Sequence, residues 1–182
     1  CTLAYHLINF ILSQNEDFSY DLKQYSINKK NKSFKLIQNK IHPNFYLIDI
    51  ISEKKTIDIF QIRNLISDLN KSSLNSKPRI ILIDNTENLN INSINSLLKI
   101  LEEPPKNTYF ILISNNKKVL PTIKSRCINF NIILNNKTSL EISNKLFGSQ
   151  ISTLINNNLL DYYFTPGKVS NLLNFLSNHN IK

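Results

Sequence analysis

The sequence predicts an α/β fold in which a mainly parallel sheet carries helices on both faces, followed by a smaller helical part. Residues 80–83 and 109–113 are uninterrupted apolar runs, as expected of strands that are buried on both faces. Between them, apolar residues recur at helical spacing over 91–101, and Pro104 and Pro105 end that helix. Because strands and helices alternate along the chain, we expect βαβ units with parallel strands.

The first part of the chain is expected to supply two helices and one strand. A helix is predicted over 2–12, and only short structure is expected in the Asn-, Lys- and Ser-rich stretch 13–40. A strand is predicted over 45–50, after an entry turn at Pro43. Apolar residues at helical spacing predict a further helix over 59–69.

The last part of the chain changes in character. Residues 128–134 alternate partly between apolar and polar and predict the last strand, which ends at a polar break over 135–137. Short helices are then expected over 139–147, 151–160 and 168–178. This change predicts a small helical domain after the sheet.

Length and composition allow a real hydrophobic core and favour anionic partners. The chain has 182 residues, 41% of them hydrophobic, and a net charge of +9. Basic surface attracts phosphate groups without base-specific contacts. The dense basic stretch 29–40 lacks the regularly interleaved aromatic residues of a single-strand stacking platform, so it favours a solvated loop or hairpin over a dedicated DNA site.

Cysteine usage and hydropathy predict a cytoplasmic protein without a membrane span. Cys1 and Cys127 are too few and too far apart to indicate a disulfide framework, and their spacing fits no zinc motif. No apolar run approaches the roughly twenty residues that a spanning helix needs. Because the sequence starts at Cys1 directly in a helical pattern, we expect further residues before it in the full protein.

Five segments are more informative together than singly. They are residues 57–63; 80–84, similar to a Walker B strand; 95–105, similar to the helix that follows it; 120–127, similar to an SRC segment; and 165–168. In this order and spacing they resemble the clamp-loader branch of the AAA+ family, and specifically the delta-prime subunits of bacterial DNA polymerase III.

The resemblance implies an AAA+ core over 1–134 that lacks its first strand and phosphate loop, a small helical lid over 135–182, and a C-terminal collar absent from this chain. Cys1 and Thr2 would stand directly after the phosphate loop. Such a loop needs glycines so that backbone N–H groups can wrap the phosphates, and the chain has two glycines in all. Cys1 would also replace the hydroxyl that binds magnesium, and a thiol is a poor ligand for so hard a cation.

The resemblance also assigns roles to polar residues at strand ends. Asp84 and Asn85 occupy the Walker B positions, but active relatives carry a glutamate where Asn85 stands, and an amide cannot act as a carboxylate base. Ser114 and Asn115 resemble the sensor-1 position, and Lys168 resembles a sensor-2 residue. Each of these residues also has a purely structural interpretation. Asp84 could be a turn residue or helix cap, Ser114 and Asn115 a polar strand end, and Lys168 an ordinary surface lysine.

Arg126, in the segment Ser125-Arg126-Cys127, resembles the arginine finger that reaches the ATP of a neighbouring subunit. A fixed guanidinium can stabilise charge on a transferring phosphoryl group, an effect on the order of 10³ to 10⁵ in rate. The resemblance makes Ser125 and Cys127 supports for this loop. A nucleophilic role for Cys127 would need a nearby base, and no recognisable motif ties a histidine to it.

Three further carboxylates and the absence of a zinc module also bear on the candidate site. Glu102 and Glu103 lie at the carboxyl end of a predicted helix, where negative charge is disfavoured, so a partner contact or a loop-fixing role is expected. Glu87 is interpreted as a surface carboxylate in a first helical turn. Relatives often carry a four-cysteine zinc module before the His-Pro segment; residues 20–40 contain no cysteine, so we predict no zinc and no other metal.

The function implied by the resemblance is that of a non-hydrolysing clamp-loader subunit, not catalytic alone, within the DNA-directed DNA polymerase III holoenzyme. It would support ATP-driven loading of the sliding clamp onto primed DNA. Its partners would be gamma/tau and delta subunits, the clamp and primer-template DNA, with ATP and magnesium at the neighbour's site. Two alternatives are an ATP-hydrolysing gamma/tau-like motor subunit of the same loader and a basic nucleic-acid-binding α/β protein.

Overall fold

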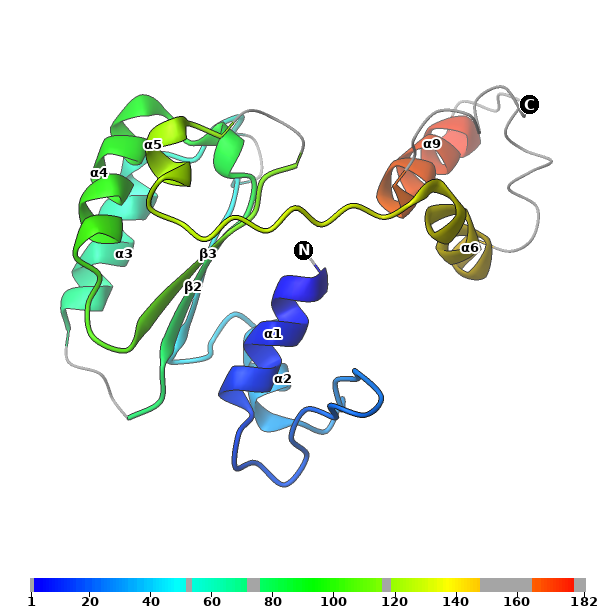
Figure 1. Cartoon of the computed structure of the whole chain (residues 1–182), viewed down its shortest axis with the longest axis horizontal. Coiled ribbons are helices and arrows are strands. Elements are labelled where there is room, and N and C mark those ends of the chain that lie inside the picture. The colour runs from blue at the N-terminus through cyan, green and yellow to red at the C-terminus, as the bar shows by residue number, and fades with distance from the viewer. Residues whose placement is uncertain (1, 52–53, 72–75, 116–118, 148–164, 179–182) are drawn as a thin grey trace. The chain divides into compact units, whose positions relative to one another are not determined.

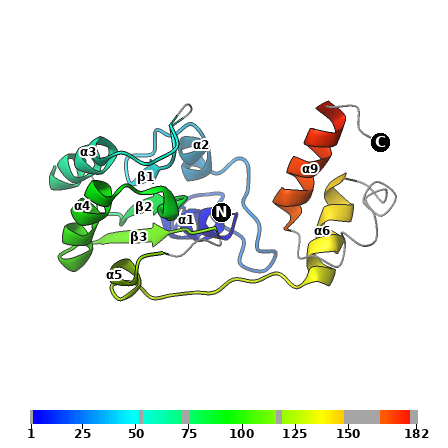
Figure 2. The ribbon, with the colours of Figure 1, turned by 90° about the horizontal axis from the view of Figure 1, so that it is seen from above.

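The computed structural model describes residues 2–51, 54–71, 76–115, 119–147 and 165–178. The chain divides into two compact units, residues 1–128 and 129–182. Figures 1 and 2 show the elements of each unit. Cys1 and the helix predicted over 151–160 lie outside the described residues.

The first unit is built on a parallel sheet with the strand order β1-β2-β3. The strands are β1 (Phe45–Ile48), β2 (Arg79–Ile83) and β3 (Thr108–Leu112). Both pairings are parallel, with Ile83 opposite Ile48 on one side and Leu112 on the other. The predicted α/β class and parallel pairing are confirmed.

Helices cover both faces of this sheet. On one face lie α3 (Ile59–Asn70) and α4 (Ile91–Glu102), and on the other lie α1 (Thr2–Leu12) and α2 (Lys32–Gln38), as Figure 1 shows. Alternate residues of β2 enter two separate hydrophobic cores: Ile81 and Ile83 belong to the first, Ile80 and Leu82 to the second. This alternation is what a strand buried on both faces requires.

Local signals explain where the helices of the first unit begin. Asn90 caps α4 by accepting a hydrogen bond from the backbone N–H of Ser93 at 2.8 Å, and Asn31 caps α2 in the same way. At α3, the Gln61 side chain accepts from the backbone N–H of Asp58 at 3.1 Å. A short helix, α5 (Pro121–Lys124), begins with proline at its first position, where proline needs no donor partner.

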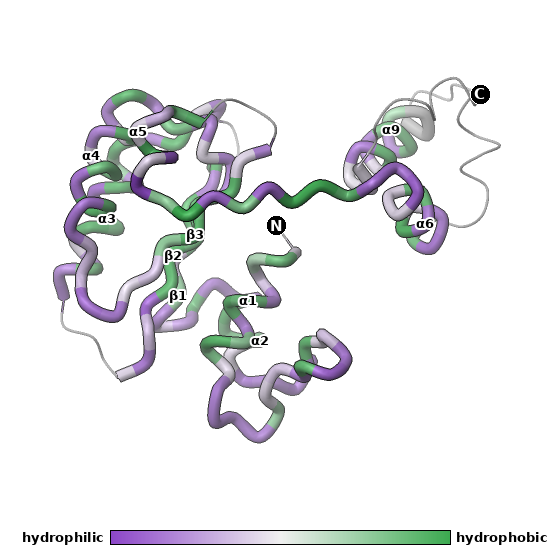
Figure 3. The backbone as a smooth tube through the Cα atoms, viewed as in Figure 1, coloured by the Kyte–Doolittle hydropathy of each residue, from purple (hydrophilic) through white to green (hydrophobic). Residues whose placement is uncertain are grey.

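The strand predicted over 128–134 is absent. These residues are described but form no strand, and the side chains of Ile128, Phe130, Ile132 and Ile133 are exposed. Figure 3 shows the alternation of apolar and polar residues along this segment. Alternation gives strand propensity, but a strand also needs a neighbouring edge, and no described strand pairs with these residues.

The second unit contains two described helices that pack on each other, α6 (Asn136–Phe147) and α9 (Pro166–Asn178). They confirm the helices predicted over 139–147 and 168–178, and each begins two or three residues early. Val169 is buried, and α6 buries the small residues Ser139 and Ser143. No helix in the described ranges is long and apolar enough to span a membrane.

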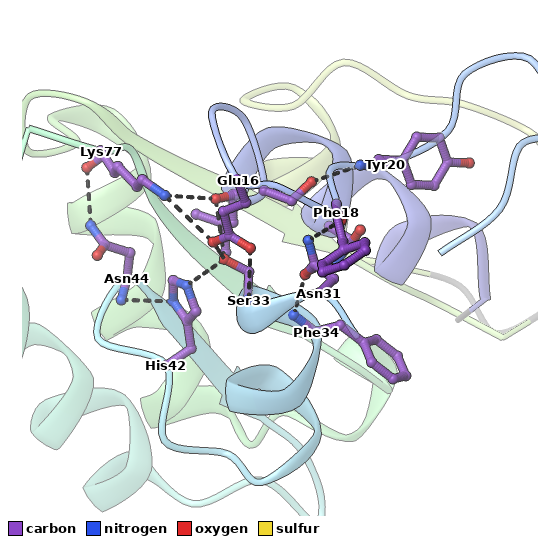
Figure 4. Close-up of polar contacts among 12 residues, drawn as sticks. Glu16, Phe18, Tyr20, Asn31, Ser33, Phe34, His42, Asn44 and Lys77 are labelled. Carbon is purple, nitrogen blue, oxygen red and sulfur yellow. Dashed lines mark hydrogen bonds and ion pairs between the residues drawn. The ribbon is translucent and has the colours of Figure 1, made fainter. Parts of the chain in front are cut away.

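A buried polar cluster holds the segment between α1 and β1 in place (Figure 4). The Ser33 hydroxyl donates to Glu16 Oε1 at 2.5 Å and lies 3.3 Å from His42 Nε2. The backbone N–H of Asn44 donates to His42 Nδ1 at 3.1 Å, so the ring proton is on Nε2. Lys77 Nζ lies 3.7 Å from Glu16 Oε1.

This cluster favours one protonation state for each of two groups. Burial lowers the pKa of His42, and the positive charge of Lys77 adds to this. Burial opposes charge on Glu16, but two hydrogen bonds from Ser33 and the charge of Lys77 outweigh it and lower the pKa of that carboxyl. The folded state therefore prefers a neutral imidazole and an ionised carboxylate.

We expect the free energy of unfolding to fall as pH drops below about 6.5, because the unfolded chain then binds a proton at His42 that the fold resists. A second decrease is expected below about 4.5, where Glu16 begins to take up its proton in the unfolded chain. His42→Gln can still accept from Asn44 and donate to Ser33, so it should remove the first decrease and keep the second. Urea unfolding from pH 7.5 to 4 measures both; equal slopes between pH 7 and 5.5 in the two proteins would contradict the assignment to His42.

Candidate functional site

Polar residues follow all three strands at the same edge of the sheet. Asp49 follows β1, Asp84 and Asn85 follow β2, and Ser114 and Asn115 lie just beyond β3. Because the strands are parallel, their carboxyl ends meet at one edge, where open α/β sheets bind ligands. The fold thus places the predicted residues Asp84, Asn85, Ser114 and Asn115 at a common edge.

Asn85 is the centre of the hydrogen bonds at this edge. Its side-chain Nδ2 donates to Asp49 Oδ1 at 2.8 Å, and its Oδ1 accepts from Asn115 Nδ2 at 3.1 Å. Its backbone N–H donates to Asp84 Oδ1 at 2.9 Å. The residue has φ 56°, a left-handed conformation that asparagine tolerates better than most residues. One amide therefore joins the ends of β1 and β3 across β2.

Two further residues surround this edge. Glu87 lies in the short 3-10 helix η1 (Thr86–Asn88), and not in the first turn of the next long helix, as the sequence predicted, because α4 begins only at Ile91. It also accepts from the backbone N–H of Asn115, at 3.3 and 3.4 Å for its two oxygens. Burial raises the pKa of Tyr5 on α1, and the charges of Asp84 and Asp49 raise it further.

The polar groups at this edge form hydrogen bonds with one another. The carboxylates accept from the Asn85 amide and from backbone N–H groups, and the Asn85 amide oxygen accepts from the Asn115 amide. Within the described ranges, no group of three or more His, Cys, Asp or Glu side chains is arranged to hold a metal ion. Thr2 begins α1 and is exposed.

Arg126 lies elsewhere, in the turn after α5, and binds the carboxyl end of α4. Its Nε donates to Glu102 Oε1 at 3.0 Å, and its Nη2 donates to the same oxygen. Its Nη1 donates to the backbone carbonyl of Thr122 at 2.9 Å. Glu102 therefore has the loop-fixing contact that its place at the end of a helix led us to expect.

The neighbours of Arg126 support this turn. The Ser125 hydroxyl donates to the carbonyl of Thr122 at 3.0 Å, and Cys127 packs against the first hydrophobic core. Burial raises the pKa of the Cys127 thiol, which disfavours the nucleophilic thiolate. The role of both residues as supports for the loop stays a prediction.

Lys168 lies in the second unit, near the start of α9. Its backbone N–H donates to the Thr165 hydroxyl at 3.3 Å, which caps the helix, and the residue is exposed. Its sensor-2-like role stays a prediction.

Sequence reasoning missed Asp49 as a partner of Asn85 and did not pair Glu102 with Arg126. Asp49 was placed inside a strand predicted over 45–50, whereas β1 ends at Ile48. The signal that could have identified Asp49 was its position as a single acidic residue at the end of an apolar run, which is also the position of Asp84.

Comparison with known proteins shows the family. Residues 2–135 match the family described as "DNA polymerase III, delta subunit". DNA polymerase III subunit delta' of Buchnera aphidicola subsp. Baizongia pistaciae is 36% identical over 119 residues, covering 57% of this chain and 35% of that protein. The delta' subunit of Bacillus subtilis is 36% identical over 99 residues, covering 53% and 29%.

Other subunits of the same polymerase are also similar. DNA polymerase III subunit tau of Escherichia coli is 36% identical over 86 residues, covering 47% of this chain and 13% of that protein. A gamma-subunit-related crystal structure from Thermotoga maritima matches with 26% identity and a TM-score of 0.45, covering 54% and 33%. The matches span about a third of the delta' relatives or less. The match over residues 2–135 shows that this chain belongs to the DNA polymerase III delta-subunit family, and its relatives place it among the delta-prime-like clamp-loader subunits.

Proposed function

We propose that this chain is the AAA+ core of a clamp-loader subunit of DNA polymerase III that does not hydrolyse ATP and that supplies Arg126 to a neighbouring ATPase. The observation that carries the proposal is the place of Asn85. ATP-hydrolysing members of the AAA+ family carry a glutamate at this position after β2, and that glutamate orients the attacking water. This chain has the amide of Asn85 there, and it bridges Asp49 and Asn115.

Asn85 supports the absence of hydrolysis in two ways. An amide oxygen cannot take a proton from an attacking water as a carboxylate can. The amide is also engaged on both sides, because its nitrogen faces the Asp49 carboxylate and its oxygen faces Asn115. The Asn85 side chain therefore offers an attacking water no base, and its amide oxygen already accepts from Asn115.

Arg126 supports an action in trans. Its side chain is about one-third exposed, at 33%, so a phosphate group of another subunit can reach it. A guanidinium presents N–H groups in a fixed fork that matches phosphate oxygens. The ATP and magnesium on which it acts would be bound by the neighbour, with a rate effect on the order of 10³ to 10⁵.

The proposed partners follow from the relatives. Their names are DNA polymerase III subunits delta', gamma and tau, which supports a hetero-oligomer with gamma/tau and delta subunits. In that assembly, the chain would help to load the sliding clamp onto primer-template DNA. The net charge of +9 is compatible with nearby DNA.

Similarity to a gamma subunit, 35% identical over 97 residues in Buchnera aphidicola subsp. Schizaphis graminum, favours the motor-subunit alternative. The bridging amide at Asn85 argues against it. The alternative of a basic nucleic-acid-binding protein depends on Lys29, Lys30 and Lys32, which are exposed just before α2 and at its first position. Exposure suits a solvated surface as well as a DNA contact.

Arg126→Ala should lower ATP turnover at the neighbouring site by about 10³-fold or more in a reconstituted loader, because the transferring phosphoryl group loses its guanidinium. Arg126→Lys keeps the charge but loses the fork, so partial activity is expected. Lys106→Ala, which removes an exposed cation in the loop after α4, is the matched control. Turnover that is unchanged in Arg126→Ala would refute the arginine-finger role.

Asn85→Glu should not create an ATPase. The new carboxylate would face Asp49 and would lose the donor at 2.8 Å, so we expect the free energy of unfolding to fall by about 1 to 3 kcal/mol. Phosphate release by the full-length subunit alone and urea unfolding measure the two effects, with the exposed Asn64→Glu on α3 as control. ATP hydrolysis by the unmodified full-length subunit alone would favour the motor-subunit alternative.

Charge reversal of Lys29, Lys30 and Lys32 to glutamate separates the clamp-loader proposal from the nucleic-acid alternative. We expect clamp loading onto primed DNA to keep most of its rate, since the arginine finger and the strand edge are untouched. Clamp loading measured by fluorescence gives the result. Loss of loading by this variant, together with full activity of Arg126→Ala, is the pattern that the alternative predicts.

A further inference from the structure

We propose that Glu102 is a positioning residue that holds Arg126 folded back on its own subunit until a phosphate group on the neighbour takes its place. This inference rests on the proposed role of Arg126 in trans. It adds a regulatory contact at the same arginine, formed by a residue to which the resemblance gives no role.

The geometry shows that the guanidinium is occupied within its own chain. Nε and Nη2, which form one side of the fork, both donate to Glu102 Oε1. Nη1 donates to the carbonyl of Thr122 at 2.9 Å and lies 3.4 Å from the Ser125 hydroxyl. All three nitrogens thus have intramolecular partners. A phosphate that binds two adjacent N–H groups must displace at least one of these contacts.

The contact with Glu102 is well suited to be displaced. It uses one carboxylate oxygen, and the side chain of Glu102 is 51% exposed, so water and salt reach the pair. Exposed ion pairs contribute little to stability and are screened by salt. A phosphate group carries more charge and offers more oxygens than one carboxylate. Exchange from Glu102 to phosphate is therefore favourable once a neighbour presents its nucleotide.

Both partners stand on rigid supports. Glu102 ends α4, and Pro104 and Pro105 prevent the helix from continuing. On the other side, Ile123 of α5 is buried in the first core, and its carbonyl accepts from the backbone N–H of Arg126 at 3.1 Å. A carboxylate at a helix C-terminus is unfavourable by itself, and the guanidinium compensates for it. The backbone on both sides of the contact is therefore anchored, and exchange of partners requires rotation of the two side chains only.

The chain supplies a matched control for this contact. Glu103 follows directly as the non-helical C-cap residue of α4 and is also exposed. Glu102→Gln and Glu103→Gln each remove one negative charge from the same helix end and keep the side-chain length. A difference between them reports the contact with Arg126 and not the net charge.

In a reconstituted loader at low salt, Glu102→Gln should raise ATP turnover at the neighbouring site about two- to five-fold, since an exposed ion pair restrains the arginine only weakly. The ratio to the wild type should approach one at about 0.5 M salt, where the pair is screened. Glu103→Gln should match the wild type at every salt concentration. A Glu102→Gln turnover that equals that of Glu103→Gln, or falls below the wild type, would overturn the proposal.

One further variant and one NMR measurement separate failure of this inference from failure of the finger role. The double variant Glu102→Gln/Arg126→Ala should behave as Arg126→Ala, because the effect of Glu102 requires the arginine. If Arg126→Ala alone leaves turnover unchanged, the finger role fails and the contact is tested by NMR on the uncomplexed full-length subunit. There the Arg126 Nε–H signal, assigned by its loss in Arg126→Lys, should shift and exchange faster in Glu102→Gln than in Glu103→Gln. Identical spectra of the two glutamine variants at this signal would rule out the contact.

Discussion

The burial of β2 on both faces and its pairing on both edges is the constraint on which the first unit depends. Ile80, Ile81, Leu82 and Ile83 are all inaccessible to solvent, and they alternate between two hydrophobic cores. Complete burial of each such side chain contributes roughly 1.5 to 3 kcal/mol. Because β1 and β3 both pair with this strand in parallel, their polar ends are brought to the end of β2. The geometry of the candidate site is a consequence of that pairing.

The residue at position 85 determines what this edge can do. A polar side chain between the Asp49 carboxylate and the Asn115 amide must donate on one side and accept on the other, and asparagine does both. A carboxylate in the same place would have no proton to give to Asp49 at neutral pH. The amide of Asn85, which cannot act as a carboxylate base, therefore also completes the hydrogen bonds across the three strand ends.

Local patterns in the sequence predicted most of the fold, whereas contacts between distant residues did not follow from them. The apolar runs located β2 and β3, and the proline pair gave the end of α4 within two residues. The prediction of a strand over 128–134 was wrong because alternating apolar and polar residues indicate only a local strand propensity, while a strand also requires a neighbouring edge to pair with. The contacts of Ser33 with Glu16 and of Arg126 with Glu102 join residues 17 and 24 positions apart, and no periodicity encodes them.

The two groups of polar residues differ in how firmly they are held, and this difference fits the proposed division of labour. Ser33 is 1% exposed, and Asn85 is partly buried with several partners, so these groups are positioned for a fixed structure. Arg126 instead makes an exposed ion pair through one carboxylate oxygen. An arginine that acts on another subunit must leave its resting place, and a firm buried pair would oppose that movement. A weak contact at the end of a rigid helix keeps the guanidinium ordered and its charge balanced, yet leaves it available to a stronger anion.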